Sequence, residues 1–185
     1  MINTIIFDFG DVFINLDKPA IKRELHQLGV TSISEDMLEI AKQYEKGVIS
    51  TNDFVTSFKT KYPSISAAQF KNAWNSIILE FPEYRLEFLE HLSTSKRYKL
   101  ILLSNTNALH IEQVIENMSL YRYERFKNCF DQFYLSHEIQ LRKPDTSIYE
   151  FVLEENKLQA SACIFIDDTK ENTEAAAELG IHTWN

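Results

Sequence analysis

Acidic, basic and hydroxyl side chains gather in four polar clusters along the chain, and each cluster follows a short apolar segment. Three clusters contain Asp8, Ser104 and the pair Asp167-Asp168, and the fourth, reached after a longer connection, contains Lys143. Taken singly, each has an ordinary structural explanation, because Asp and Ser are common in turns and at helix N-termini, and a lysine before a proline is common in a solvated turn. The four clusters indicate a particular chemistry only when they are considered together.

Together these side chains have the composition of a site for phosphoryl transfer. Asp8 and the pair Asp167-Asp168 would repel one another unless a divalent cation lay among them, and hard carboxylate oxygens favour Mg²⁺. The amine of Lys143 and the hydroxyl of Ser104, beside helix N-termini, provide a matching site for a dianion. A carboxylate nucleophile, Mg²⁺ and a dianion indicate phosphoryl transfer through an aspartyl-phosphate, with Asp8 as the nucleophile.

These side chains can meet only if the fold brings them to a common edge. Continuous apolar runs predict buried parallel strands over residues 4–7, 100–103, 133–135 and 163–166, with a fifth strand starting at Ile181. Helical patterns over residues 110–117, 147–156 and 172–179 separate the later strands, and Gly180 is expected to end the last helix. This alternation predicts a Rossmann-like α/β fold with a doubly wound parallel sheet. Ligands bind beyond the carboxyl ends of the strands in such sheets, which is where all four clusters lie.

A purely helical segment interrupts the alternation between the first and second strands. Helical patterns cover residues 18–28, 34–46, 52–61, 67–79 and 83–92, with aromatic residues at helical spacing, namely Phe54, Phe58, Phe70, Trp74 and Phe88. We expect these aromatic side chains to form the core of this segment rather than a cofactor pocket. The predicted organisation is therefore an α/β core of residues 1–17 and 96–185 with an inserted all-helical cap domain of residues 18–95.

Composition restricts the partners of the protein. The 185 residues include 27 acidic and 19 basic side chains, and the resulting net charge of −8 argues against nucleic acid and anionic membranes as partners. Two cysteines are too few for a disulfide framework, and neither a signal peptide nor an apolar run of membrane-spanning length is present. We therefore expect a cytoplasmic protein that acts on a small molecule, and the sequence leaves its oligomeric state open.

The four clusters resemble the motifs of the haloacid dehalogenase-like (HAD) hydrolase superfamily, in the same order. The matching segments are residues 6–12 (IFDFGDV), 103–106 (LSNT), 141–145 (LRKPD) and 165–169 (FIDDT). The helical segment lies where that superfamily inserts its cap, and residues 44–54 and 135–142 resemble the bacterial sugar-phosphatase-like branch, which includes glucose-1-phosphate phosphatases. The resemblance implies an Mg²⁺-dependent phosphatase for a small phosphomonoester such as a sugar phosphate. It places Asp8, the Gly10 carbonyl, Asp167 and Asp168 at the metal, and Ser104, Asn105 and Lys143 at the phosphate.

Gly10 is the main departure from this pattern. Phosphatases of the superfamily usually carry a second aspartate two residues after the nucleophile, where it protonates the leaving oxygen and later activates water. Gly10 has no such side chain, and the carboxylate of Asp11 lies one residue further along. We therefore expect slower or differently assisted chemistry that depends on an easily departing group, such as an anomeric sugar oxygen.

Three other functions fit parts of the pattern. A haloacid dehalogenase also lacks the second aspartate, but it has no need of the pair Asp167-Asp168. A catalytically weak or inert HAD-fold binding or regulatory module would not need nucleophile, hydroxyl, lysine and acidic pair together. A phosphomutase is the remaining alternative. We favour the phosphatase over all three.

Overall fold

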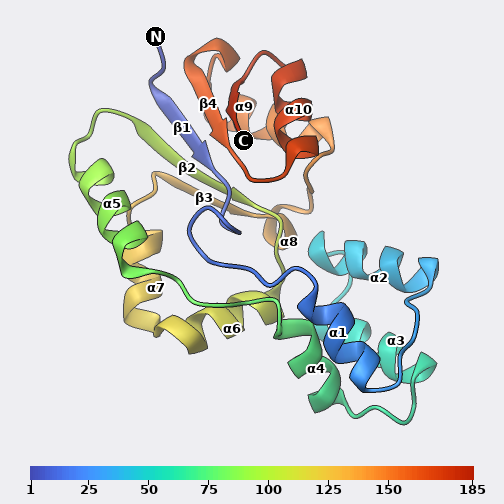
Figure 1. Cartoon of the computed structure of the whole chain (residues 1–185). Helices are drawn as coiled ribbons and strands as arrows, with labels where there is room; N and C mark the ends of the chain where they lie inside the picture. The colour runs from blue at the N-terminus through green and yellow to red at the C-terminus, as the bar shows by residue number, and fades with distance from the viewer.

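The computed structural model describes all residues 1–185. The chain folds into a five-stranded parallel sheet that is covered by helices, and a further group of helices lies at one end (Figure 1). The strands are β1 (Thr4–Phe7), β2 (Lys99–Ser104), β3 (Gln132–Leu135), β4 (Cys163–Ile166) and β5 (His182–Trp184). Their order is β3-β2-β1-β4-β5, and every neighbouring pair is parallel. The predicted doubly wound α/β fold is confirmed, and the observed strand bounds differ from the predicted ones by at most one residue.

Helices cover both faces of the sheet. On one face lie α5 (Glu83–Thr94), α6 (Ala108–Met118) and α7 (Leu120–Lys127), and on the other lie α9 (Thr146–Glu155) and α10 (Lys170–Glu178). Successive residues of a strand point to opposite faces. On β2, Leu100 and Leu102 pack in the first layer, whereas Ile101 and Leu103 pack in the second. All four are buried, which explains why the strand is a continuous apolar run.

The sheet has its topological switch point between β1 and β4. From β1 the chain moves to β2 and β3 on one side, and it then returns to place β4 and β5 on the other side. At such a point the connections leave in opposite directions and open a crevice beyond the strand ends. Asp8 and Asp167 directly follow these two strands, so the topology alone brings them together.

The inserted helices α1 (Ala20–Gln27), α2 (Glu35–Glu45), α3 (Thr51–Lys61) and α4 (Ala67–Asn75) form a second hydrophobic cluster, which Leu109 of α6 joins from the core. Phe54, Phe58, Phe70 and Trp74 are buried in it, as expected. The expectation for Phe88 is wrong, because this side chain is 56% exposed. It lies on α5, whose Leu86 and Leu89 face the sheet and so direct Phe88 to solvent.

The helix α5 therefore packs on the sheet and not within the cap. Leu86 and Leu89 share a cluster with Phe7 and Leu100, together with Phe81 from the preceding connection. This arrangement differs from the expected boundary at residue 95, because helical periodicity identifies an apolar face but not the surface that covers it. We propose that the cap ends between α4 and Phe81.

The sequence patterns did not predict two of the helices, α7 and the single turn α8 (Ser136–Ile139) after β3. A short 3₁₀ turn, η1 (Ala160–Ala162), precedes β4. Ser119 separates α7 from α6 with a φ of 73°, and no proline or glycine marks the break. None of the helices is long and apolar enough to cross a membrane.

Gly47 follows the end of α2 and allows the cap to approach the core closely. Its φ is +66°, and a Cβ atom there would lie 2.0 Å from the backbone oxygen of His137 in α8. We expect Gly47→Ala to lower the free energy of unfolding by about 1–3 kcal/mol, because it combines backbone strain with a backbone clash. Urea unfolding measures this loss.

Gly29→Ala is the matched control. Gly29 also has a positive φ, of +91°, but nothing lies within 4 Å of the position of a Cβ atom. The difference between the two variants isolates the contact between cap and core, and equal losses would show that this contact is unimportant.

Candidate active site

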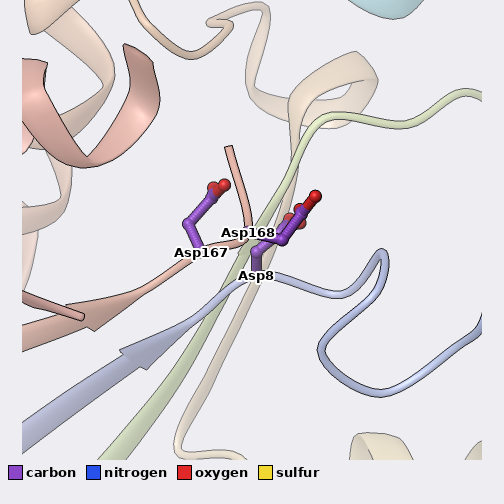
Figure 2. A group of neighbouring side chains, drawn as sticks. All are labelled: Asp8, Asp167 and Asp168. Atoms are coloured by element: carbon purple, nitrogen blue, oxygen red, sulfur yellow. The ribbon is translucent and has the colours of Figure 1, made fainter. Parts of the chain in front are cut away.

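Asp8 is held at the end of β1 by its two neighbours in the chain. Phe7 and Phe9 are buried in the aromatic layer on one face of the sheet, and the Asp8 N–H donates to the Ile166 carbonyl at 2.9 Å. Only 8% of Asp8 is exposed. Its carboxylate lies beside those of Asp167 and Asp168, and one oxygen from each lies within 4.8 Å of the others (Figure 2). The structure thus brings together the three carboxylates that the sequence singled out.

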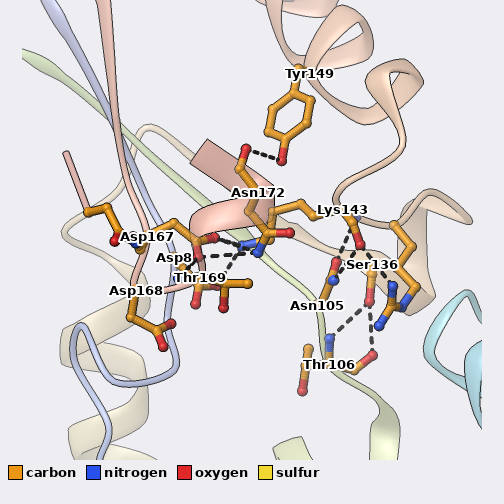
Figure 3. Close-up of polar contacts among 12 residues, drawn as sticks. Asp8, Asn105, Thr106, Ser136, Lys143, Tyr149, Asp167, Asp168, Thr169 and Asn172 are labelled. Carbon is orange, nitrogen blue, oxygen red and sulfur yellow. Dashed lines mark hydrogen bonds and ion pairs between the residues drawn. The ribbon is translucent and has the colours of Figure 1, made fainter. Parts of the chain in front are cut away.

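Lys143 lies between two of these carboxylates (Figure 3). Its Nζ atom is 2.7 Å from Asp8 Oδ1 and 2.7 Å from Asp167 Oδ2, and the residue is only 1% exposed. Burial raises the pKa of Asp8, the nearby Lys143 ammonium lowers it, and Asp167 raises it. Burial is the largest of these effects, so Lys143 only partly offsets the cost of keeping Asp8 ionised.

The two aspartates after β4 have different surroundings. Asp167 accepts hydrogen bonds from the Thr169 N–H at 2.7 Å and from Asn172 Nδ2 at 3.2 and 3.0 Å, in addition to the contact with Lys143. Asp168 is partly exposed and contacts only the Lys18 ammonium. Asp168 therefore has more oxygen capacity left for a metal ion. Asn172 was missed from the sequence, although its place in the first turn of the helix after the Asp-Asp pair was a usable signal.

The charge and the donor atoms of this cluster fit Mg²⁺. Lys18 also lies 3.1 Å from Asp11, so four carboxylates face two ammonium groups, and two negative charges are left over. One divalent cation neutralises that excess. The Gly10 carbonyl accepts no hydrogen bond within the chain and supplies a further oxygen. Oxygen ligands of this kind suit a hard cation.

The loop after Asp8 carries no carboxyl side chain at the second position, because that residue is Gly10. The next residue, Asp11, has a φ of 54°, and its carboxylate accepts from the Leu16 N–H at 3.0 Å and contacts the Lys18 ammonium. The Asp11 carboxylate is therefore held by groups of its own loop. No acid side chain therefore stands at the position where the superfamily that the sequence resembles usually carries one to protonate the leaving oxygen.

The expected phosphate-binding residues take two different roles. Ser104 is buried at the end of β2, and its hydroxyl has no hydrogen-bond partner within the chain. The side chain of Asn105, in contrast, contacts the backbone of Lys143: Oδ1 accepts from the Lys143 N–H and Nδ2 donates to the Lys143 carbonyl, both at 2.9 Å. The expectation that Asn105 belongs to the phosphate site stays a prediction, and the structure adds that its side chain holds the backbone of Lys143.

Comparison with known proteins agrees with this geometry. Residues 5–185 match the family described as haloacid dehalogenase-like hydrolase. The chain belongs to this family. It is a HAD hydrolase, and its sheet and cap are those of the HAD fold.

Three known proteins illustrate the range of similarity. A D-ribitol-5-phosphate phosphatase of Bacteroides thetaiotaomicron is 25% identical over 190 residues, which cover 100% of this chain and 91% of that protein. A HAD family enzyme of the same organism, solved as a magnesium complex, is 34% identical with a TM-score of 0.88 and coverage of 100% and 92%. A dehalogenase structure is 14% identical with a TM-score of 0.59 and coverage of 98% and 83%, and it shares the fold alone.

A buried histidine joins the cap to the HAD core next to the site. The ring of His110 stacks on Trp74 of the cap, with centroids 5.2 Å apart, and its Nε2 donates to the Trp74 carbonyl at 3.1 Å. Its Nδ1 lies 3.1 Å from the side-chain amide nitrogen of Asn107 and must accept from it. This arrangement requires a neutral imidazole, and burial lowers the pKa of His110 to about 4.

The neutral His110 makes stability depend on pH. Between the ordinary histidine pKa of 6.5 and the folded value of about 4, the unfolded chain binds a proton that the folded chain does not. The free energy of unfolding therefore falls as the pH falls through this window, by about 3 kcal/mol from this group. We expect His110→Gln to remove that contribution to the pH slope, measured by urea unfolding at pH 7 and at pH 4.5.

The same substitution at the exposed His26 controls for the loss of a histidine. A slope that is unchanged in His110→Gln would contradict the role assigned to His110.

Proposed function

We propose that this HAD hydrolase is a phosphatase that cleaves a small phosphomonoester, a sugar or sugar-alcohol phosphate, through an aspartyl-phosphate formed on Asp8. The observation that carries the proposal is the position of Asp8. It lies at the switch point of the sheet, within 2.7 Å of a buried ammonium group and beside two further carboxylates. A carboxylate that attacks a phosphate dianion needs positive charge beside it. Lys143 supplies part of this charge, and a bound divalent cation would supply the rest.

The expected Mg²⁺ cofactor is confirmed. The related HAD enzyme of Bacteroides thetaiotaomicron has been solved with magnesium and also with magnesium and inorganic phosphate, and the carboxylate cluster here has the matching charge and oxygen donors. In our proposal Asp8, Asp167, Asp168 and the Gly10 carbonyl hold the ion. When bound, Mg²⁺ offsets negative charge on the phosphate and on Asp8.

The protein side chains carry out the other steps of the proposed reaction. Asp8 attacks phosphorus through its carboxylate, the bond from phosphorus to the ester oxygen breaks, and the leaving oxygen departs and takes a proton from water. The Ser104 hydroxyl and the Lys143 ammonium hold the oxygens of the transferring phosphoryl group. Charge on these oxygens is spread in the transition state, and donors fixed in a buried site stabilise it without reorganisation. Water then hydrolyses the aspartyl-phosphate and releases inorganic phosphate. Asn105 contributes by fixing the backbone of Lys143.

The substrate class rests on two observations. A relative that matches the whole chain is a D-ribitol-5-phosphate phosphatase, and the related HAD enzyme has been solved with magnesium and inorganic phosphate. The dehalogenase alternative is not favoured, since a reaction without a metal leaves the carboxylate surplus without a partner.

Replacing Asp8 tests the nucleophile. We expect Asp8→Asn to lower phosphate release by more than about 10³-fold, because an amide cannot form the phosphoryl intermediate. The fold should persist, since Lys143 keeps its contact with Asp167. The measurement is phosphate release from ribitol 5-phosphate, glucose phosphates and p-nitrophenyl phosphate, with Mg²⁺ and after exhaustive EDTA treatment.

Asp17→Asn is the control, because Asp17 belongs to the same loop but contacts Arg23 of the cap. Activity of Asp8→Asn above a few per cent of wild type, or wild-type activity that survives EDTA, would refute the mechanism.

The absent side chain at Gly10 predicts a dependence on the leaving group. Glucose 1-phosphate should react faster than glucose 6-phosphate, because an anomeric oxygen tolerates negative charge better and needs less proton donation. A Cβ atom on Gly10 would lie 2.7 Å from Leu16 Cδ1, which is the end of a flexible side chain and can move. We therefore expect Gly10→Asp to gain most on the 6-phosphate, measured as kcat/KM for both esters.

Gly10→Asn has the same size without the acid and should not gain. If wild type cleaves both esters equally and Gly10→Asp changes nothing, another group donates the proton. Asp11, held by the Leu16 N–H and Lys18, would then be the residue to replace.

A further inference from the structure

One residue of the cap, Glu45 at the end of α2, contacts two of the core loops around the site. Its carboxylate lies 2.7 Å from Nε of Arg142, the residue before Lys143. Its backbone carbonyl accepts a hydrogen bond of 2.6 Å from Ser136 Oγ, which in turn accepts from the Thr106 N–H at 2.9 Å. Glu45 thus connects the cap to the loop after β2 and to the loop that carries Lys143.

The contact through Arg142 reaches the backbone of Lys143. Arg142 Nη1 donates to the Lys143 carbonyl at 2.9 Å, and Asn105 Nδ2 donates to the same oxygen at 2.9 Å. Asn105 also accepts from the Lys143 N–H. Both the N–H and the carbonyl of Lys143 are therefore held by hydrogen bonds, and these bonds fix the position of the backbone from which its long side chain extends.

We propose that Glu45 is a positioning residue, which holds the Arg142 guanidinium so that it donates to the Lys143 carbonyl and keeps the ammonium aligned with Asp8. The inference rests on the proposed function, since it assigns Lys143 to the transferring phosphoryl group. Its consequence is that turnover requires the cap to be seated, because only then does Glu45 reach Arg142. Displacements of about 1 Å in a catalytic group are enough to lower a rate substantially.

A second ion pair between the same parts provides a natural comparison. Lys46 lies next to Glu45 and contacts Asp145 at 2.8 Å, so it joins the same end of α2 to the same core loop. Asp145 is 55% exposed, and neither residue of this pair contacts Lys143. The two pairs are alike as links between cap and core, and they differ in their contact with the catalytic lysine.

The experiment compares single and paired replacements at these positions. We expect Glu45→Ala to lower kcat about tenfold with KM changed less than about twofold, while Lys46→Ala leaves both near wild type. Glu45→Gln should recover part of kcat, because its amide oxygen still accepts from Arg142 Nε. In the reversed pair Glu45→Arg/Arg142→Glu the ion pair and the melting temperature should return but kcat should stay low, because a carboxylate cannot donate to the Lys143 carbonyl.

Binding of vanadate, which mimics the transferring phosphoryl group, gives a second readout by calorimetry in the presence of Mg²⁺. Its affinity should fall in Glu45→Ala and not in Lys46→Ala. The inference is overturned if Lys46→Ala lowers kcat as much as Glu45→Ala, if Glu45→Ala changes KM alone, or if the reversed pair restores kcat. A wild-type protein that neither releases phosphate nor binds vanadate would instead refute the proposed function.

Discussion

A buried ammonium group between two buried carboxylates is the interaction on which the rest of the structure depends. Lys143 Nζ lies 2.7 Å from both Asp8 and Asp167, and all three residues are almost completely removed from solvent. Burying any of these charges alone is very unfavourable, so the three groups require one another. Together with Asp168 the cluster keeps an excess of negative charge, and this excess makes the site a place for Mg²⁺ rather than a closed salt bridge.

The surrounding fold keeps this charged centre rigid from several directions. Phe9 and Phe13 pack among other aromatic side chains of the core and anchor the loop after Asp8. Asn172 holds Asp167 from α10, and Asn105 holds the backbone of Lys143. The sheet supplies the position and these polar contacts supply the orientation. A site built on strand ends and on locked side chains is more precise than one built on free loops.

The sequence by itself determined the strands and the residues at their ends. Each apolar run is continuous because its strand is buried on both faces, and this pattern is local enough to read without a structure. Four of the five strands end at, or lead to, a residue that the sequence already singled out, and parallel strands in one sheet must end at a common edge. The positions of Asp8, Ser104, Lys143 and Asp167 at the site follow from this rule.

Only the tertiary structure decided which surfaces and polar groups meet. The sequence placed α5 and Phe88 in the cap, but α5 packs on the sheet, because periodicity defines an apolar face and not its partner. The side chain of Asn105 holds the backbone of Lys143, which is 38 residues away in the chain, and this contact was not predicted. Glu45 and Arg142 are separated by 97 residues. Hydrogen bonds across such distances depend on the packing of whole elements, which no local pattern of residues encodes.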